Sequence, residues 1–119
     1  MAYSPDDNRI LLYGGRDQNG LLVNELWVYN PDANTWTEKE KSGWECVPVC
    51  PAARAVHSMV YDEFNEKFVV FGGYLVSGHK FETNETWTYD LATNTWTRLS
   101  FGSQDVPEPR HWGSLEYNP

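Results

Sequence analysis

The sequence predicts an all-β protein built from two copies of one four-stranded unit, and three observations lead to this prediction. The 119-residue chain is rich in Trp, Tyr, Gly and Pro rather than in helix-forming residues. Its apolar residues come in short runs that turn residues interrupt. Three blocks of sequence also occur twice in the same order, which is the signature of a repeat architecture.

The first block of each unit is a short apolar strand. Residues 9–13 and 67–71 are apolar runs that end in a Gly-Gly pair. An unbroken apolar run is typical of a strand covered on both faces, and the glycines supply a turn that needs positive φ. Both segments are therefore predicted to be buried inner strands. The glycines concerned are Gly14, Gly15, Gly72 and Gly73.

The second block is an aromatic hairpin, at residues 24–37 and again at residues 84–97. Each copy reads Asn-Glu-x-Trp-x-Tyr, then a polar turn, then Asn-Thr-Trp-Thr. Two aromatic residues separated by one position lie on the same side of a pleated strand, and the Asn- and Asp-containing segment is typical of a turn. The aromatic residues are Trp27, Tyr29 and Trp36 in the first copy and Trp87, Tyr89 and Trp96 in the second.

The third block contains a Pro-x-x-Arg sequence, at residues 51–58 and again at residues 107–114. Residues 54–61 are predicted to form a further strand. This strand is expected to end at a turn formed by residues 62–66. One unit then has four antiparallel strands, which we call A, B, C and D. Strand A contains the Arg, strand B is the apolar strand, and strands C and D form the aromatic hairpin.

These blocks, in this order and along nearly the whole chain, resemble the kelch repeat. The resemblance implies a β-propeller in which each unit is one blade. It further implies that the Gly pair ends strand B, that the Trp and Tyr of strand C pack between blades, and that strand A lines a central channel. The second copy departs from the pattern in having Gly113 where the first has His57.

The lengths of the connections differ between the copies in only two places. The spacing of equivalent residues is 58 at Gly15 and Gly73, 60 at Trp36 and Trp96, and 56 at Arg54 and Arg110. The B to C and D to A connections therefore vary, and both emerge at the same end of a blade because the strands alternate in direction. Length variation confined to one end of a repeat favours that end as the binding face.

The two ends of the chain fall at the same point of the repeat. Residues 1–5 and 115–119 both align with residues 59–63. The chain is thus expected to open at the tail of one strand A and to close with a surplus strand A. We expect blade 1 at residues 1–53 with its strand A supplied by another copy, blade 2 at 54–109, and residues 110–119 completing the next blade.

Two blades cannot close a ring alone, and they would expose two apolar sheet faces. We therefore expect a head-to-tail homo-oligomer that is closed by strand exchange. Propellers have four to eight blades, and pairs give even counts. A six-bladed trimer is the first expectation, an eight-bladed tetramer the second and a four-bladed dimer the third. A fragment of one longer chain is the alternative that stays open.

Several residues are candidates for contacting a ligand. The resemblance implies that Arg54 and Arg110 can point at an acidic peptide or protein from strand A, since a guanidinium pairs bidentately with carboxylates. A purely structural bond to loop carbonyls or to an acidic neighbour is equally expected. His57, Trp112 and the loop residue Trp44 are further ligand candidates, for which packing is the competing interpretation.

Composition narrows the classes of partner. A formal net charge of −8 argues against nucleic acid, because a phosphate backbone needs clustered Lys and Arg. The apolar stretches are too short to span a membrane, so a soluble chain is expected. Cys46 and Cys50 cannot by themselves form a four-ligand zinc site. Ordinary thiols are the first interpretation of the pair, a local disulfide the second and a metal site the third.

The function predicted from the sequence is binding rather than catalysis. No nucleophile and base pair, phosphate loop, cofactor motif or metal cluster is evident. The family resembled includes copper-dependent sugar oxidases, but their Tyr, Cys and His residues come from several blades, and both cysteines here lie in one loop. We expect a scaffold for a protein or peptide. A lectin-like or enzyme-like module that takes a small ligand such as a sugar in the channel is the alternative.

Overall fold

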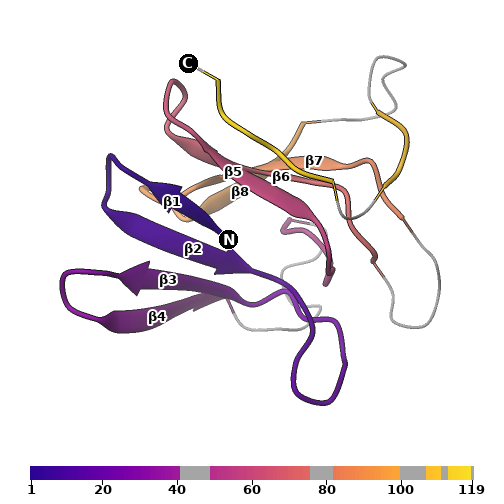
Figure 1. Ribbon diagram of the computed structural model, residues 1–119, viewed down its shortest axis with the longest axis horizontal. Coiled ribbons are helices and arrows are strands. Elements are labelled where there is room, and N and C mark those ends of the chain that lie inside the picture. Colours follow the sequence, from indigo (N-terminus) through magenta and orange to yellow (C-terminus); the bar gives the residue numbers. More distant parts are fainter. Residues whose placement is uncertain (41–48, 76–81, 100–106, 111–112, 119) are drawn as a thin grey trace.

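The computed structural model describes residues 1–40, 49–75, 82–99, 107–110 and 113–118. These residues form two four-stranded antiparallel sheets that pack face to face (Figure 1). The first sheet has the order β1 (Ala2–Ser4), β2 (Arg9–Tyr13), β3 (Leu26–Asn30) and β4 (Thr35–Glu40). The second has the order β5 (Ser58–Asp62), β6 (Lys67–Phe71), β7 (Thr86–Asp90) and β8 (Thr95–Arg98).

The predicted inner strands and their glycine turns are confirmed. β2 and β6 have the predicted bounds. The four glycines have φ angles of 67° and 103° in the first copy and 73° and 101° in the second, in the region that side chains disfavour. A Cβ on Gly14 would lie 2.7 Å from the carbonyl oxygen of Arg54, and one on Gly72 would lie 2.7 Å from that of Arg110. Glycine is therefore required both by conformation and by close backbone approach.

Strand A of the second blade is shorter than predicted. It begins at Ser58, not at Arg54. Val56 has a φ of 52°, which interrupts an extended strand. Arg54 instead pairs with the first blade, where its carbonyl accepts from the N–H of Gly15 (2.7 Å) and its N–H donates to the carbonyl of Val23 (3.4 Å). Residues 54–57 thus link two blades rather than extend one.

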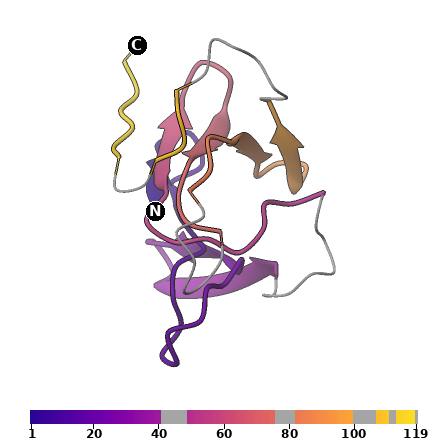
Figure 2. The ribbon, with the colours of Figure 1, turned by 90° about the vertical axis from the view of Figure 1, so that its right-hand side faces the viewer.

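The first blade has a short strand A of its own. β1 pairs with β2 in the register Ala2↔Leu11, which matches Val60↔Val69 in the second blade. These three residues are the tail of strand A with which the chain was expected to open, and the supply of the rest of this strand by another copy stays a prediction. The predicted surplus strand A at residues 110–119 forms no strand within the described residues, and residues 113–118 run beside β5 (Figure 2).

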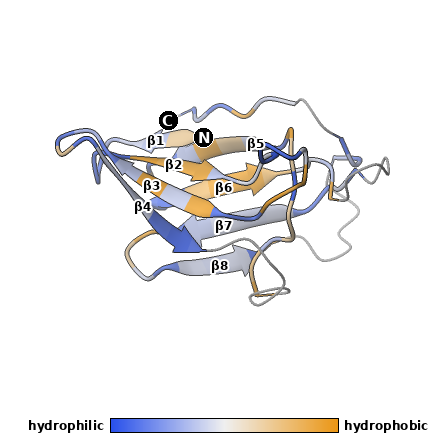
Figure 3. Cartoon of the chain, turned by 90° about the horizontal axis from the view of Figure 1, so that it is seen from below, coloured by the Kyte–Doolittle hydropathy of each residue, from blue (hydrophilic) through white to orange (hydrophobic). Residues whose placement is uncertain are grey.

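The core lies between the two sheets, where opposite faces of the two blades meet. Strands β2 and β3 contribute mainly aliphatic residues together with Tyr13, and β6, β7 and β8 contribute mainly aromatic ones. Figure 3 shows the apolar residues concentrated on the inner strands, whereas the outer strand β4 is largely hydrophilic. The main members of this junction are Leu11, Tyr13, Leu26, Val28, Phe68, Val70, Trp87, Tyr89 and Trp96.

The connections separate by length as predicted. The turns that join β1 to β2, β3 to β4 and β5 to β6 lie at one end of the sheets, and the described parts of the longer connections lie at the other (Figure 1). We call these the turn end and the loop end. The described residues contain no helix that is long and apolar enough to cross a membrane.

Candidate functional site

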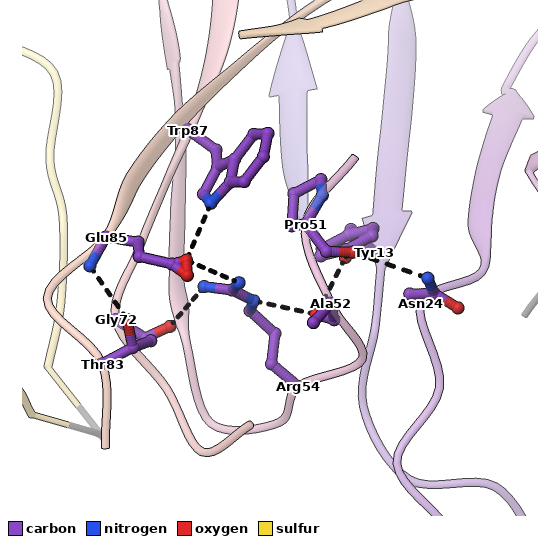
Figure 4. A network of polar contacts seen from close by, with 9 residues as sticks. All are labelled: Tyr13, Asn24, Pro51, Ala52, Arg54, Gly72, Thr83, Glu85 and Trp87. Carbon is purple, nitrogen blue, oxygen red and sulfur yellow. Dashed lines mark hydrogen bonds and ion pairs between the residues drawn. The ribbon is translucent and has the colours of Figure 1, made fainter. Parts of the chain in front are cut away.

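The most developed polar site in the described residues joins the two blades at the loop end, and Arg54 is its centre (Figure 4). The side chain of Arg54 is completely buried. Its Nε donates to the carbonyl of Ala52 (3.1 Å), and Nη1 donates to the carbonyl of Gly72 (3.2 Å) across the junction. Nη2 lies 3.5 Å from a carboxylate oxygen of Glu85. One guanidinium thus connects the loop of one blade to strands B and C of the next.

The carboxylate of Glu85 is held in place by its own blade. The indole Nε1 of Trp87 donates to it (3.3 Å), and the backbone N–H of Glu85 donates to the hydroxyl of Thr83 (3.1 Å). Burial lowers the pKa of Arg54, and the negative charge of Glu85 opposes that change. A buried charge needs such a partner, because a guanidinium without one would carry a large desolvation cost.

A second set of contacts anchors the D to A loop. The hydroxyl of Tyr13 donates to the carbonyl of Pro51 (2.8 Å) in the buried interior. The amide of Asn24 also lies 3.5 Å from that carbonyl. Burial raises the pKa of Tyr13, so its hydroxyl keeps its proton and remains a donor. The backbone that carries Arg54 is therefore fixed by two side chains of the first blade.

His57 is wedged between the glycine turns of the two blades. A Cβ on Gly14 would lie 3.0 Å from Cε1 of His57, and one on Gly73 would lie 3.0 Å from its Cβ. The ring makes an edge contact with Tyr13, with centroids 5.6 Å apart. Burial, with the charge of Arg54 second, lowers the pKa of His57 to about 4. A neutral ring in this place fills space between the blades.

These placements bear on the ligand contacts that the sequence predicted. Arg54 is completely buried in the described chain, where its side chain contacts the protein itself, and its role toward a ligand stays a prediction. Arg110 is exposed, and its Nε donates to the carbonyl of Glu108 (3.1 Å). Trp44 and Trp112 lie outside the described residues, so their roles stay predictions, as do those of Arg110 and His57.

The predicted aromatic positions divide between two environments. Trp87, Tyr89 and Trp96 are buried in the junction between the blades, as the resemblance implied. Trp27 and Tyr29 are half-buried and Trp36 is exposed, because these three lie on the face of the first blade that points away from the second. The inference that the aromatic residues pack between blades therefore holds at the junction within the described chain.

The role of Glu85 was missed by sequence reasoning. Its signal was present, since an Asn-Glu pair precedes the first Trp of each hairpin at residues 24–25 and 84–85. In the first blade the equivalent Glu25 accepts from the indole Nε1 of Trp27 (3.0 Å). A repeated acidic residue beside a repeated Trp, with a repeated Arg elsewhere in the unit, indicates a buried ion pair between units.

The cysteines also differ from the first interpretation. Cys50 is disulfide-bonded, so its assignment as an ordinary thiol was wrong. Cys46 lies outside the described residues. Within the described residues, no group of three or more His, Cys, Asp and Glu side chains is arranged to hold a metal ion.

The loop end of the described chain carries exposed apolar side chains. Leu21 lies at the tip of the β2 to β3 connection, and Val49 lies in the β4 to β5 connection, and both are exposed. Asp17 shapes the first of these loops, because its carboxylate accepts from the backbone N–H groups of Asn19 (2.8 Å) and Leu21 (3.0 Å). At the turn end, Phe64 is the comparable exposed residue.

Comparison with known proteins agrees with the repeat. A family model described as the KLHDC2/KLHL20/DRC7 Kelch-repeats domain matches residues 1–117. Over 106 residues the chain is 32% identical to Mei4-dependent protein 6 of Schizosaccharomyces pombe. The aligned residues make up 85% of this chain and 14% of that protein. Over 112 residues it is 33% identical to the flagellar outer arm dynein alpha chain of Chlamydomonas reinhardtii. Here the aligned residues make up 92% of this chain and 2% of that protein.

A third relative also matches most of this chain over a small part of its own length. Host cell factor of Drosophila melanogaster is 28% identical over 111 residues, which cover 85% of this chain and 7% of that protein. The chain therefore spans a small part of the length of the curated relatives that it matches.

Proposed function

The chain belongs to the kelch-repeat family, and on that basis we propose that it is a two-blade binding module whose loop end contacts a protein or peptide. The observation that carries the proposal is that connections of variable length and turns of constant length emerge at opposite ends of the sheets. All length variation between the copies falls at the loop end, and the two blades are locked together directly beneath it by Arg54 and Glu85. A rigid base with variable loops is a common arrangement for a binding surface.

The exposed apolar side chains at the loop end supply candidate contacts. Leu21 and Val49 are both more than half exposed. Exposed apolar groups on anchored loops can be buried by a partner without a large loss of loop entropy, because the backbone that carries them is already ordered. Trp44 is predicted to add an aromatic contact from the same β4 to β5 connection.

A panel of peptides screened with the purified chain would test this proposal. For a peptide that binds, Leu21→Ser and Val49→Ser should each weaken binding by about 1 kcal/mol, which is roughly fivefold. Phe64→Ser, an equally drastic change at the turn end, is the matched control and should leave affinity unchanged. Loss of binding in the Phe64 variant alone would place the binding surface at the other end.

The second part of the proposal concerns ring closure. We propose that copies of the chain associate head to tail, with a six-bladed trimer as the first expectation and a tetramer as the second. The support is that each described blade has one face covered by the other blade and one face that is not. Light scattering of the purified chain tests this, and a well-folded monomer at every accessible concentration would contradict it.

A further inference from the structure

A cavity of about 450 Å³ lies between the edge strands of the two sheets. These strands, β1 and β5, are the A strands of the two blades, and they contact one another. Two of the lining residues, Pro5 and Glu63, belong to the turns that follow these strands, so the cavity lies toward the turn end. It is therefore separate from the loop end, where the partner proposed above would bind.

Three residues that line this cavity are the same tyrosine of the repeat. Tyr3, Tyr61 and Tyr117 are equivalent in the alignment of residues 1–5, 59–63 and 115–119. All three line the cavity, the third because residues 113–118 run beside β5 (Figure 2). The repeat thus gathers three aromatic side chains at one place. The face of an aromatic ring is electron-rich, so several rings around one cavity attract a cation.

Hydrogen bonds hold two of these rings in place. The hydroxyl of Tyr61 donates to the carboxylate of Asp6 (2.9 Å), and that of Tyr3 donates to the side-chain oxygen of Asn8 (3.1 Å). The ring of Tyr61 also packs on Phe68, with centroids 4.8 Å apart. Burial is the main cause that raises the pKa of Tyr61 to about 12, and the carboxylate of Asp6 adds to it. The ring is therefore uncharged and already ordered before a ligand arrives.

The rest of the lining is apolar except for one carboxylate. Ala2 and Met59 pack against the core of the junction and form part of the apolar wall. Glu63 is the acidic member of the lining. No Lys or Arg among the described residues lines the cavity. A cation that enters would thus meet aromatic faces and a negative charge, and no side chain of like charge.

We propose that this cavity binds a trimethylammonium group. The rings of Tyr3, Tyr61 and Tyr117 supply cation–π contacts to it, and Glu63 balances its charge. Methyl groups make this cation weakly hydrated, so its transfer to an aromatic lining costs less than that of a primary ammonium. The inference goes beyond the proposed contact of the loop end with a protein and does not depend on it.

The lining favours such a cation over a sugar, although both can lie against aromatic rings. A sugar needs hydrogen-bond partners for its hydroxyl groups. The hydroxyls of Tyr3 and Tyr61 already donate within the protein, and the side chains of Ala2 and Met59 offer no strong donor or acceptor. A trimethylammonium group carries no N–H and needs no such partner. It occurs on small molecules such as choline and on trimethylated lysine side chains of proteins.

Two ligands of equal shape test the role of the charge. Choline should bind to the purified chain, and its neutral analogue, in which a tert-butyl group replaces the trimethylammonium, should bind at least roughly tenfold more weakly. Titrations at constant ionic strength, followed through the amide resonances of residues 59–63 in nuclear magnetic resonance spectra, measure both affinities at the cavity. Equal affinities, or no shift with either ligand, would overturn the proposal.

Substitution of the rings tests the location of the site. Tyr3→Leu and Tyr117→Leu should each weaken choline binding roughly three- to tenfold, because each removes one aromatic face. Tyr3→Phe keeps the ring and should bind choline within about twofold of the original chain. Tyr61 is left unchanged in this series because its ring also belongs to the core. Equal losses in the Phe and Leu variants would show that the ring of Tyr3 does not contact the cation.

A matched pair of charge changes tests the carboxylate. Glu63→Gln should weaken choline binding roughly threefold and leave the affinity of the neutral analogue unchanged. Glu66→Gln makes the same change in the same turn, at a residue outside the lining of this cavity, and should leave choline binding unchanged. Equal losses in the two variants would show that choline responds to the overall negative charge rather than to Glu63. Near-ultraviolet circular dichroism checks that each variant is folded.

A second pair of ligands separates the two sources of the cation. A short Gly-Ser peptide that carries one trimethyllysine should bind, and the same peptide with unmodified lysine should bind at least roughly tenfold more weakly. Tighter binding of the trimethylated peptide than of choline would favour a modified protein as the source, and the reverse would favour a small molecule. Equal binding of the two peptides would overturn the proposal. Peptide binding at the loop end is measured independently, so the two proposals can fail separately.

Discussion

The two blades share one sequence pattern but not one environment. Trp36 and Trp96 occupy equivalent positions, yet Trp36 is 48% exposed and Trp96 is 9% exposed. Arg110 and Arg54 make the same backbone bonds, yet the first is exposed and the second completely buried. The difference arises because, within the described chain, the first blade covers the face of the second blade that carries Trp96, whereas the equivalent face of the first blade points away from the second. Burial in this fold is decided by the adjoining blade rather than by the repeat itself.

The largest expected contrast is at the outer-strand Trp residues. Trp96→Ala should lower the free energy of unfolding by about 3–5 kcal/mol, since it opens a cavity in the junction. Trp36→Ala should cost less than about 1 kcal/mol in the dissociated chain, because nearly half of the side chain already contacts solvent. Urea denaturation at low protein concentration measures both. Equal effects would show that the two blades are buried alike.

Replacing the equivalent acidic residues of the two blades should also cost more stability in the second blade than in the first. Glu85→Gln should cost about 3 kcal/mol, because it leaves the buried guanidinium of Arg54 without a counter-charge. Glu25→Gln keeps an acceptor for Trp27 and should cost less than about 1 kcal/mol. Thermal unfolding midpoints at low concentration compare the pair. A large cost at Glu25 alone would mean that the inner ion pair is not what joins the blades.

Lowering the pH should weaken the junction between the two blades, because this junction contains His57. The equivalent residue of the second copy is Gly113. The pKa of His57 is lowered from 6.5 to about 4 in the folded chain, so the unfolded chain binds more protons in that window. Stability should therefore fall as pH decreases from about 6.5 to about 4, by roughly 2–3 kcal/mol in total, and should not depend on this group above pH 6.5.

Comparison with His57→Asn isolates that contribution, since the carboxylates titrate in both proteins. The difference in unfolding free energy between the original chain and the variant should shrink as the pH falls through the window. A difference that is constant with pH would show that His57 is not held neutral by burial.

The smallest contrast concerns one hydroxyl. Tyr13→Phe makes the first blade resemble the second and should cost about 1 kcal/mol, because the carbonyl of Pro51 loses its closest donor but keeps Asn24 nearby. The reverse change, Phe71→Tyr, should be close to neutral because Phe71 is only half-buried. Chemical denaturation of both variants tests this. A cost at Phe71 equal to that at Tyr13 would show that the two positions are equally enclosed.

Much of the fold was predictable because it depends on short stretches of sequence. The bounds of β2 and β6 follow from apolar runs that end in glycine, and the hairpins follow from aromatic residues at alternate positions around a polar turn. The inequality of the loops follows from counting residues between repeats. None of these inferences needs knowledge of a distant contact.

The candidate site was only partly predictable because its members are brought together by packing. Arg54 was recognised as special, but sequence alone left open a ligand contact and a structural bond. The structure places it against Gly72 and Glu85, which lie far along the chain in the next blade. Glu85 itself was overlooked because a glutamate in a loop is usually solvated, and its signal lies only in the repetition of Glu, Trp and Arg between the two units.

The sequence by itself determined the repeat, the strand pattern and the glycine turns, because side-chain alternation and backbone sterics act over a few residues. Only the tertiary structure decided where strand A begins, which aromatic residues are buried and which Arg is paired. Those features depend on the approach of one sheet to another, and equivalent local sequences reach different states when only one of them has a neighbouring sheet within the described chain.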